Sequence, residues 1–225
     1  MKYPLYLLFI IMLGSSCEKK GEVITKENVT EVLTRYGKES PEDEVEIETS
    51  FGNIRLKLYA DTPLHRANFI KLIKEGYYND ADFYRVVYQF MIQGGDQKKF
   101  LPYRIPSEFI ATHYHKKGVL AMARTDDNNP NKESSSTEFY IVQGRRYADW
   151  EIDEEARNAG ITLTPEQRQT YLTLGGDMSL DQKYTVFGEV LDGIQVVDTI
   201  AQARVYNERP NKKIPFTIRI VEGKK

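Results

Sequence analysis

The sequence predicts a mainly β fold: a closed, eight-stranded antiparallel barrel capped by two helices, with a helical segment inserted between two strands. Three observations favour it. Eight short segments rich in β-branched and aromatic residues follow one another between residues 45 and 221. Only two amphipathic helical patterns interrupt them outside the insertion. Closure of such a sheet removes exposed strand edges, which are prone to aggregation.

The first elements are a hairpin and a helix. Residues 45–50 and 54–59 alternate apolar and polar side chains around a Phe-Gly-Asn turn, which is typical of a β-hairpin. In the next segment Thr62 is a suitable N-cap, Pro63 fits the first helical position and Gly76 marks the end. The apolar stripe of this helix comprises Leu64, Ala67, Ile70 and Ile73.

The remaining strands share the same composition. They are predicted at Phe83–Tyr88, Phe90–Gly94, Val119–Ala123, Glu138–Val142, Tyr184–Glu189 and Ile214–Val221. A second helix, Ile194–Ala201, precedes the last strand. With the hairpin, these segments supply the eight strands of the barrel.

Residues 145–179 have no strand pattern and are predicted to form the insertion. The stretches 148–160 and 164–176 both have a helical composition. The second begins with Thr-Pro-Glu-Gln from Thr164, which has the signature of a capping box. We therefore expect two helices between barrel strands.

Length, composition and charge describe an ordinary globular domain. The 225 residues suit one domain with additions, and 40% hydrophobic and 28% charged residues allow a full core without disulfides or metal. The net charge of −2 argues against a nucleic-acid partner, which needs a basic face. A single cysteine excludes an internal disulfide. His113 and His115 lack a third ligand nearby, so a surface loop fits them better than a metal site.

The N-terminus has the pattern of an export signal. A lysine precedes an apolar run from Leu5 to Leu13, which is shorter than the about 20 residues that span a bilayer. We predict a signal peptide over residues 1–16. Cys17 follows it and is similar to the acylated cysteine of bacterial lipoproteins, although Gly14 stands where that motif usually has leucine. The alternative is an ordinary cleaved signal with an incidental cysteine.

Residues 17–44 are rich in Glu and Lys. They are predicted to form a lipid anchor and a polar tether, with one helical turn around Val29–Leu33. Two or three acyl chains on Cys17 give a stable membrane anchor. The globular domain is then expected over residues 45–225.

Four blocks of sequence point to one family. They are FYRVVYQFMIQGGD (83–96), GVLAMAR (118–124), STEFYIV (136–142) and YTVFGEV (184–190). In order and rough spacing they resemble the cyclophilins, the peptidyl-prolyl cis–trans isomerases. FGNIRLKLYADTPLHRANFIKL (51–72) is similar to the first hairpin and helix of that family. The resemblance runs from about Val45 to Val221 outside the insertion, and it implies a cyclophilin-like barrel of the exported bacterial type.

The chemistry of this family gives Arg85 a reason to stand in an apolar strand. A prolyl amide rotates in about tens to hundreds of seconds without a catalyst, because resonance stiffens its C–N bond. A fixed donor favours the twisted amide, whose nitrogen has regained a lone pair. The resemblance implies that Arg85 is this catalytic donor, and its guanidinium is always charged. Taken alone, Arg85 fits an edge strand in water equally well.

The resemblance also implies the substrate-binding residues. Gln93 is expected to hold Arg85 and to bond the peptide backbone, while Ala123 and Arg124 lie on the strand that meets that backbone. The wall of the proline pocket is expected to comprise Phe90, Met91, Phe139, Leu180 and Tyr184. Taken one at a time, Phe90, Met91 and Phe139 also fit an ordinary core.

Three positions depart from the family. Glu138 stands where glutamine is frequent, and its carboxylate can pair with Arg85 or Arg124 and so alter binding. Tyr184 stands where many members have histidine. Ser179 replaces a tryptophan of many eukaryotic members, which predicts weaker binding of cyclosporin.

The sequence thus predicts an exported, lipid-anchored peptidyl-prolyl isomerase of the bacterial cell envelope, in the periplasm or at the outer membrane. Its expected partners are proline-containing segments of unfolded or folding envelope proteins. No cofactor, metal or nucleic acid is expected, and the protein should act as a monomer. The rival hypothesis is a chaperone-like peptide-binding module with incidental isomerase activity.

Overall fold

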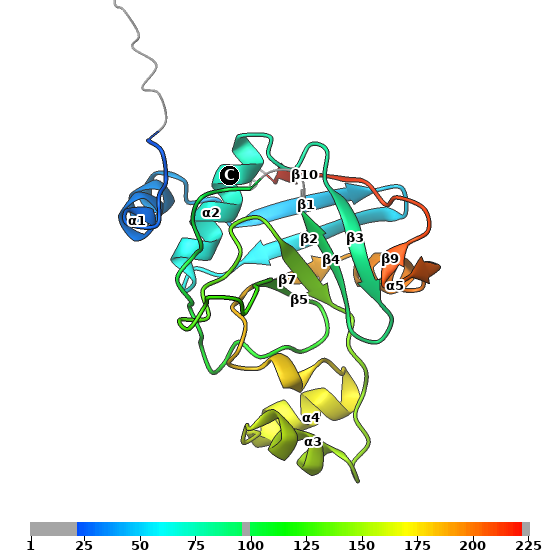
Figure 1. The fold of residues 1–225 in the computed structure, drawn as a ribbon. Helices are drawn as coiled ribbons and strands as arrows, with labels where there is room; N and C mark the ends of the chain where they lie inside the picture. Colours follow the sequence, from blue (N-terminus) through cyan, green and yellow to red (C-terminus); the bar gives the residue numbers. More distant parts are fainter. Residues whose placement is uncertain (1–21, 96–99, 222–225) are drawn as a thin grey trace, which may run out of the picture.

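A computed structural model describes residues 22–95 and 100–221, so the predicted signal peptide and Cys17 lie outside the described residues. The main sheet comprises β1 Glu44–Thr49, β2 Gly52–Leu58, β3 Asp82–Val87, β4 Met91–Gly95, β5 Val119–Met122, β6 Phe139–Val142, β7 Val186–Asp192 and β10 Phe216–Ile220. The helices are α1 Val29–Glu39, α2 Pro63–Lys74, α3 Ile152–Ala159, α4 Pro165–Thr173 and α5 Ile194–Ala201 (Figure 1). A 3₁₀ turn, Met178–Leu180, precedes β7.

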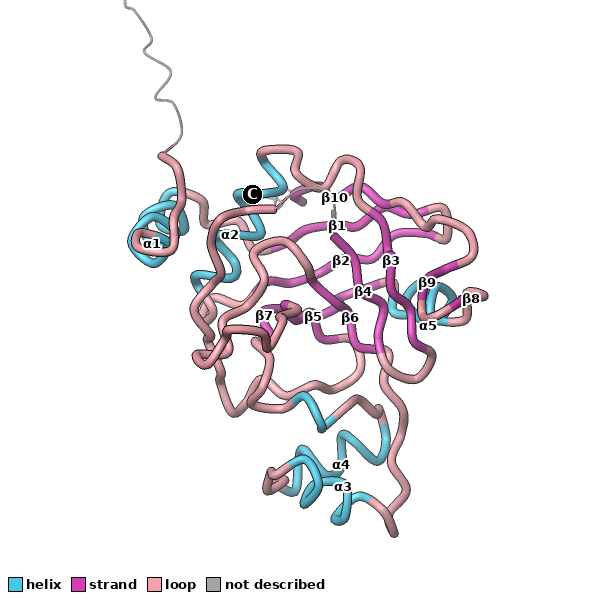
Figure 2. The backbone as a smooth tube through the Cα atoms, in the orientation of Figure 1, coloured by secondary structure: helices cyan, strands magenta, loops and turns pink. Residues whose placement is uncertain are grey.

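The eight strands curl into a nearly closed antiparallel barrel. Their order is β10-β1-β2-β7-β5-β6-β4-β3 (Figure 2). The two end strands approach one another, because Phe83 N donates to Ile214 O at 2.9 Å and Phe216 N donates to Ala81 O at 3.2 Å. The predicted barrel of eight antiparallel strands is therefore confirmed.

The barrel is filled by the inward faces of its strands and by α2. Ile47, Ile54 and Leu56 are fully buried, as the alternation of the first hairpin predicts. Phe69 of α2 packs edge-on against Phe139 and Phe187, with ring centroids 5.4 Å from each. This aromatic cluster joins α2 to the strands that also carry the candidate site.

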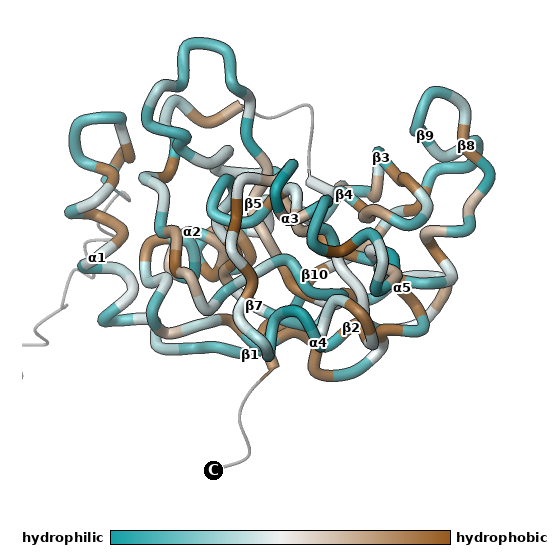
Figure 3. Tube along the Cα trace, turned by 90° about the horizontal axis from the view of Figure 1, so that it is seen from below, coloured by the Kyte–Doolittle hydropathy of each residue, from teal (hydrophilic) through white to brown (hydrophobic). Residues whose placement is uncertain are grey.

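Helix α1 corrects the prediction of a polar tether. The segment forms three helical turns, Val29–Glu39, and buries Val29, Val32 and Leu33 in the same core as the barrel. Hydrophobic bands interrupt its hydrophilic colour in Figure 3. The prediction was wrong because the Glu and Lys content obscured a narrow apolar stripe at helical spacing. From Ile24 onward the described chain is thus part of the domain.

A small second hairpin was also not predicted. Strands β8 Val205–Tyr206 and β9 Arg209–Pro210 pair through a two-residue loop, Asn207 and Glu208, whose φ angles are 47° and 63°. Each strand has only two residues, which is too short to show the alternation of apolar and polar side chains that predicts a strand. The hairpin is hydrogen-bonded to β3 of the barrel, since Val86 N donates to Glu208 O at 2.7 Å.

The insertion has the two helices that the sequence predicts. The capping box of α4 is complete, because Gln167 N donates to Thr164 Oγ1 at 3.2 Å and Thr164 N donates to Gln167 Oε1 at 3.0 Å. The insertion buries a cluster of its own, made of Tyr147, Ile152, Ala156, Ala159, Tyr171 and Met178. In the described part of the chain, every helix is too short or too polar to cross a membrane.

The packing of α1 predicts the effect of Leu33→Ala. Leu33 is fully buried, so its truncation should lower the free energy of unfolding by about 2–5 kcal/mol. Thr34→Ala, on the exposed face of the same helix, is the matched control and should change it by less than about 0.5 kcal/mol. Urea unfolding of the mature chain measures both. Equal stability of the two variants would mean that α1 is only a tether.

Candidate active site

Strands β3 to β6 and the segment before β7 enclose a pocket of about 210 Å³. It is lined by Arg85, Phe90, Met91, Gln93, Ala123, Arg124, Thr125, Glu138, Tyr140, Leu180 and Tyr184. Nine of the ten residues predicted to bind or act on substrate line this one pocket, although they are spread over about a hundred positions of the sequence. Phe139 is the exception.

The register of the sheet brings Arg85 and Gln93 together. The two residues are directly opposite each other in the antiparallel pair of β3 and β4. Arg85 Nη1 donates to Gln93 Oε1 at 3.2 Å, and Gln93 Nε2 donates to the Tyr84 hydroxyl at 2.6 Å. The guanidinium carbon of Arg85 also lies 5.8 Å from the centre of the Phe90 ring. Gln93 therefore holds Arg85, as predicted, and the catalytic role of Arg85 stays a prediction.

A carboxylate that sequence analysis missed also holds Arg85. Arg85 Nε donates to Glu208 Oε2 at 2.6 Å, from the tip of the β8–β9 hairpin. The side chains of Arg85 and Glu208 are 38% and 52% exposed, so the pair lies at the edge of solvent. Its two residues are 123 positions apart, and no local pattern in the sequence signals such a contact.

The prediction that Phe139 lines the pocket is wrong. Phe139 is fully buried in the main core, with its ring 5.4 Å from Phe69 and 5.7 Å from Phe216. The next residue, Tyr140, faces the pocket instead. Side chains alternate along an extended chain, so Tyr140 of β6 and Glu138, which directly precedes β6, face the pocket while Phe139 faces the core. This alternation could have predicted from the sequence that Tyr140, and not Phe139, faces the pocket.

Arg124 contributes a buried cation to the pocket. Its side chain is only 7% exposed, its guanidinium carbon lies 4.2 Å from the centre of the Tyr184 ring, and its Nε donates to Asp126 at 2.8 Å. Its Nη1 is buried without a hydrogen-bond partner among residues 22–95 and 100–221. Buried donors without an acceptor are uncommon and costly, so Arg124 is held in the pocket wall at some expense of stability.

Glu138 does not take the arginine partner that was expected for it. The carboxylates that pair with Arg85 and Arg124 in the described structure are Glu208 and Asp126. Glu138 instead acts on Tyr84: burial, followed by the negative charge of Glu138, raises the pKa of the Tyr84 phenol well above its ordinary value. The phenol oxygen of Tyr84 accepts the hydrogen bond from Gln93 Nε2 at 2.6 Å, so Tyr84 contacts the residue that holds Arg85.

A chain of buried polar groups supports the pocket from behind. His115, predicted to lie on a surface loop, is fully buried, with Nε2 3.0 Å from the Tyr140 hydroxyl and Nδ1 3.0 Å from Asp181 Oδ1. Tyr171 of the inserted helix α4 donates its hydroxyl to Asp181 Oδ2 at 2.6 Å. The chain Tyr171–Asp181–His115–Tyr140 thus links the insertion to the pocket wall. Among the described residues, no group of three His, Cys, Asp or Glu side chains could hold a metal ion.

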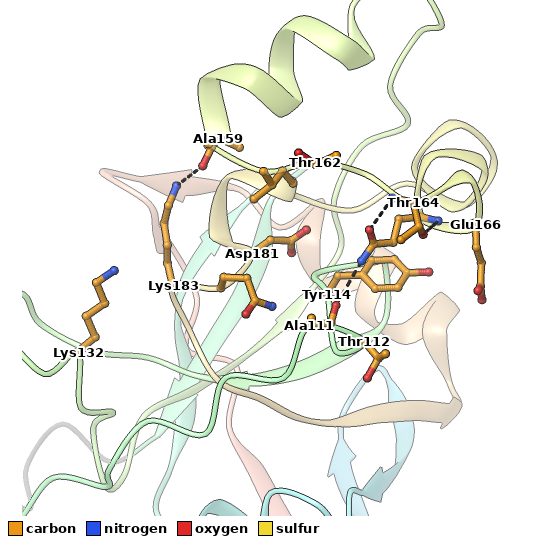
Figure 4. Close-up of a pocket in the computed structure, with 14 residues that line it drawn as sticks. Ala111, Thr112, Tyr114, Lys132, Ala159, Thr162, Thr164, Glu166, Asp181 and Lys183 are labelled. Carbon is orange, nitrogen blue, oxygen red and sulfur yellow. Dashed lines mark hydrogen bonds between the residues drawn. The ribbon is translucent and has the colours of Figure 1, made fainter.

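A larger pocket of about 690 Å³ lies beside the insertion, between the connection of α3 to α4 and residues 111–114 and 181–183 (Figure 4). Lys183 on its edge donates to Ala159 O at 3.0 Å and to Ser179 O at 2.9 Å. Leu180 and Tyr184, which flank residues 181–183 in the chain, line the smaller pocket. One short segment therefore borders both cavities.

The comparisons with known proteins agree with this geometry. Residues 44–222 match the family described as cyclophilin type peptidyl-prolyl cis-trans isomerase/CLD. The chain belongs to this family of isomerases. It is accordingly an enzyme of the peptidyl-prolyl cis–trans isomerase class.

Curated bacterial relatives are described as putative isomerases of this class. A putative peptidyl-prolyl cis-trans isomerase of Staphylococcus haemolyticus is 30% identical over 188 residues, which are 77% of this chain and 90% of that protein. A putative bifunctional phosphatase/peptidyl-prolyl cis-trans isomerase of Streptococcus pyogenes is 34% identical over 169 residues, or 70% of this chain. The match covers only 34% of that longer protein.

Solved cyclophilins share the fold at lower identity. A Cryptosporidium parvum cyclophilin-type isomerase superposes with a TM-score of 0.59 at 22% identity, covering 81% of this chain and 99% of that one. A cyclophilin from Hirschia baltica gives a TM-score of 0.56 at 18% identity, covering 81% and 75%. These likenesses confirm the barrel.

The buried chain predicts the effect of Tyr171→Phe. The variant removes one donor from the buried Asp181 carboxylate and should cost about 1–3 kcal/mol of stability. Because Asp181 orients His115, which contacts Tyr140, kcat/KM for a short Xaa-Pro peptide should also fall. Urea unfolding and a peptide isomerisation assay measure the two effects.

Tyr114→Phe is the matched control for this prediction. Tyr114 also packs beside Tyr171, but its hydroxyl donates to Thr170 Oγ1 at 3.0 Å, outside the chain that reaches Tyr140. Its removal should leave kcat/KM unchanged. Equal activity of the Tyr171→Phe variant and the wild type would show that the insertion does not support the pocket.

Proposed function

We propose that the 210 Å³ pocket isomerises Xaa-Pro bonds in unfolded or folding proteins of the bacterial envelope, and that the enzyme works while anchored through an acylated Cys17. The observation that carries the catalytic part is the position of Arg85. Its guanidinium lines the same pocket as Phe90, Met91 and Leu180, and it is held by Gln93 and Glu208.

The proposed mechanism needs no covalent step. Five decades of acceleration require about 7 kcal/mol of preferential binding of the twisted amide. The proline ring lies against Phe90, Met91 and Leu180, where little water remains to stabilise the planar amide. Arg85 donates to the amide nitrogen as its lone pair forms, and this donor is already oriented before the substrate binds.

Two further groups are suited to the peptide backbone. Arg124 lines the pocket with its guanidinium 4.2 Å from the centre of the Tyr184 ring, and this cation favours the negative end of a substrate carbonyl nearby. Ala123, on the same side of the pocket, has no bulk to obstruct the chain. A proline-containing ligand is supported by the relative from Cryptosporidium parvum, whose structure was also determined in the presence of the dipeptide Ala-Pro.

The anchored location rests on the N-terminal sequence and on α1. A thiol at Cys17 directly follows an export-type signal. Cys17 is seven positions before the buried Ile24, so a fully extended link between them spans at most about 25 Å. An acylated chain would therefore hold the barrel close to the bilayer, where exported proteins emerge unfolded.

The 690 Å³ pocket beside the insertion favours a second candidate function, the holding of longer unfolded segments. In that case isomerisation would be incidental. The two functions differ in their dependence on Arg85, because holding needs surface contact and isomerisation needs the donor.

Arg85→Ala separates these functions. One preorganised donor contributes about 10² or more to the rate, so kcat/KM on a short Xaa-Pro peptide should fall about 100-fold or more while the fold persists. Suppression of client aggregation should remain if holding is an independent function. Arg55→Ala, at a surface ion pair with Glu44, is the control and should keep full activity. Activity of the Arg85→Ala variant within twofold of wild type would disprove the proposed role.

Cys17→Ser in the full-length precursor tests the anchor. Without the thiol there is no acceptor for acyl chains, so the protein should leave the membrane fraction or accumulate unprocessed. Metabolic labelling with a fatty-acid analogue, followed by fractionation, measures both outcomes. A wild-type protein that takes up no label would establish the ordinary cleaved signal instead.

A further inference from the structure

We propose that Glu208 is a positioning residue that orients the guanidinium of Arg85 for prolyl isomerisation. The proposal rests on the role proposed above for Arg85. It goes further because it assigns a function to the β8–β9 hairpin, which lies beside β3 (Figure 2).

The contact fixes the arginine at two separate nitrogens. Glu208 Oε2 accepts from Arg85 Nε at 2.6 Å, and Gln93 Oε1 accepts from Nη1 at 3.2 Å. Acceptors on two different nitrogens of a rigid, planar guanidinium restrict the direction of the whole group. Among residues 22–95 and 100–221, Nη2 makes no hydrogen bond, and it remains for the substrate.

The backbone keeps Glu208 in register with the residue that it orients. Glu208 O accepts from Val86 N at 2.7 Å, and Val86 directly follows Arg85 on β3. The backbone of Glu208 is therefore bonded to the strand that carries Arg85. If the hairpin moved away from the barrel, this main-chain hydrogen bond would break before the two side chains could separate.

Glu208 occupies an unfavourable conformation to make this contact. A two-residue hairpin loop with positive φ at both positions prefers Asn-Gly, because glycine has no Cβ to clash. Here Asn207 has the favoured type, but a glutamate stands at the second position with φ 63°. An ion pair between groups as exposed as Arg85 and Glu208 adds little stability, and a bulky residue in the left-handed region costs a similar amount.

The pair therefore gives no net stability that would account for glutamate at this position. Strained residues that persist at a site are a reason to infer function there. The contact with the arginine on the rim of the proline pocket supplies that function.

Glu208→Gly tests the proposal, because it removes the carboxylate and relieves the backbone together. The melting temperature should stay the same or rise, while kcat/KM on a short Xaa-Pro peptide should fall about threefold to tenfold, mainly in kcat. A merely structural role would lower stability and activity together. Glu208→Gln keeps an acceptor of the same length and should restore part of the loss.

Asn207→Gly is the matched control, since it relaxes the neighbouring residue and leaves the carboxylate in place; its kcat/KM should equal that of wild type. In the Arg85→Ala background, Glu208→Gly should have no further effect. The proposal is overturned if Glu208→Gly keeps kcat/KM within twofold of wild type, raises it, or causes the same loss without Arg85.

The same set of variants separates this proposal from the function proposed above. An inactive Arg85→Ala variant together with a fully active Glu208→Gly variant would refute only the positioning role. A fully active Arg85→Ala variant would refute the assignment of the donor and the positioning role together.

Discussion

The site depends on one constraint: a guanidinium must be fixed in direction and still be open to a substrate. Full burial would fix Arg85 but exclude the peptide, and full exposure would leave its long side chain free to rotate. The barrel meets both requirements through the register of its strands, which places a partner directly opposite Arg85. Arg85 faces Gln93 across β3 and β4, and Gln93 is bonded in turn to Tyr84. Those strands are held by the pairing of β4 with β6 and by the closure of the sheet through the bonds of Phe83 and Phe216.

The wall opposite the arginine is fixed by different means. Tyr140 is held by His115, and His115 by Asp181, in a buried chain where each polar group has a partner. Such chains are specific in geometry because an unpaired member in a medium of low polarity is costly. The last member, Tyr171, belongs to α4, so the insertion contributes to the pocket of the barrel as well as to its own cluster. The inserted helices are therefore part of the site's framework.

Sequence analysis could predict the elements whose side chains repeat over several residues. The strands from Glu44 to Ile220, the helices α2 and α5 and the capping box at Thr164 all depend on local patterns. It failed where charged residues masked an apolar pattern or where an element was too short to show any pattern. The apolar stripe of α1 is diluted by charged neighbours, and β8 and β9 are too short to alternate. Phe139 and Tyr140 are both aromatic, so composition could not separate them, whereas the two faces of β6 do.

The candidate site shows the same division between local and distant information. Residues of recognisable blocks, such as Met91 and Gln93, were placed correctly relative to one another because they share a strand. The partners that hold the site together come from elsewhere in the chain: Glu208 from a hairpin and Asp181 from the segment that follows the insertion. A family pattern specifies the groups that touch a substrate. It does not specify which other residues hold those groups in place in a particular chain. Two enzymes with the same pocket residues can therefore differ in activity through supports that only the tertiary structure shows, and in this chain those supports are an acid on Arg85 and a buried histidine on Tyr140.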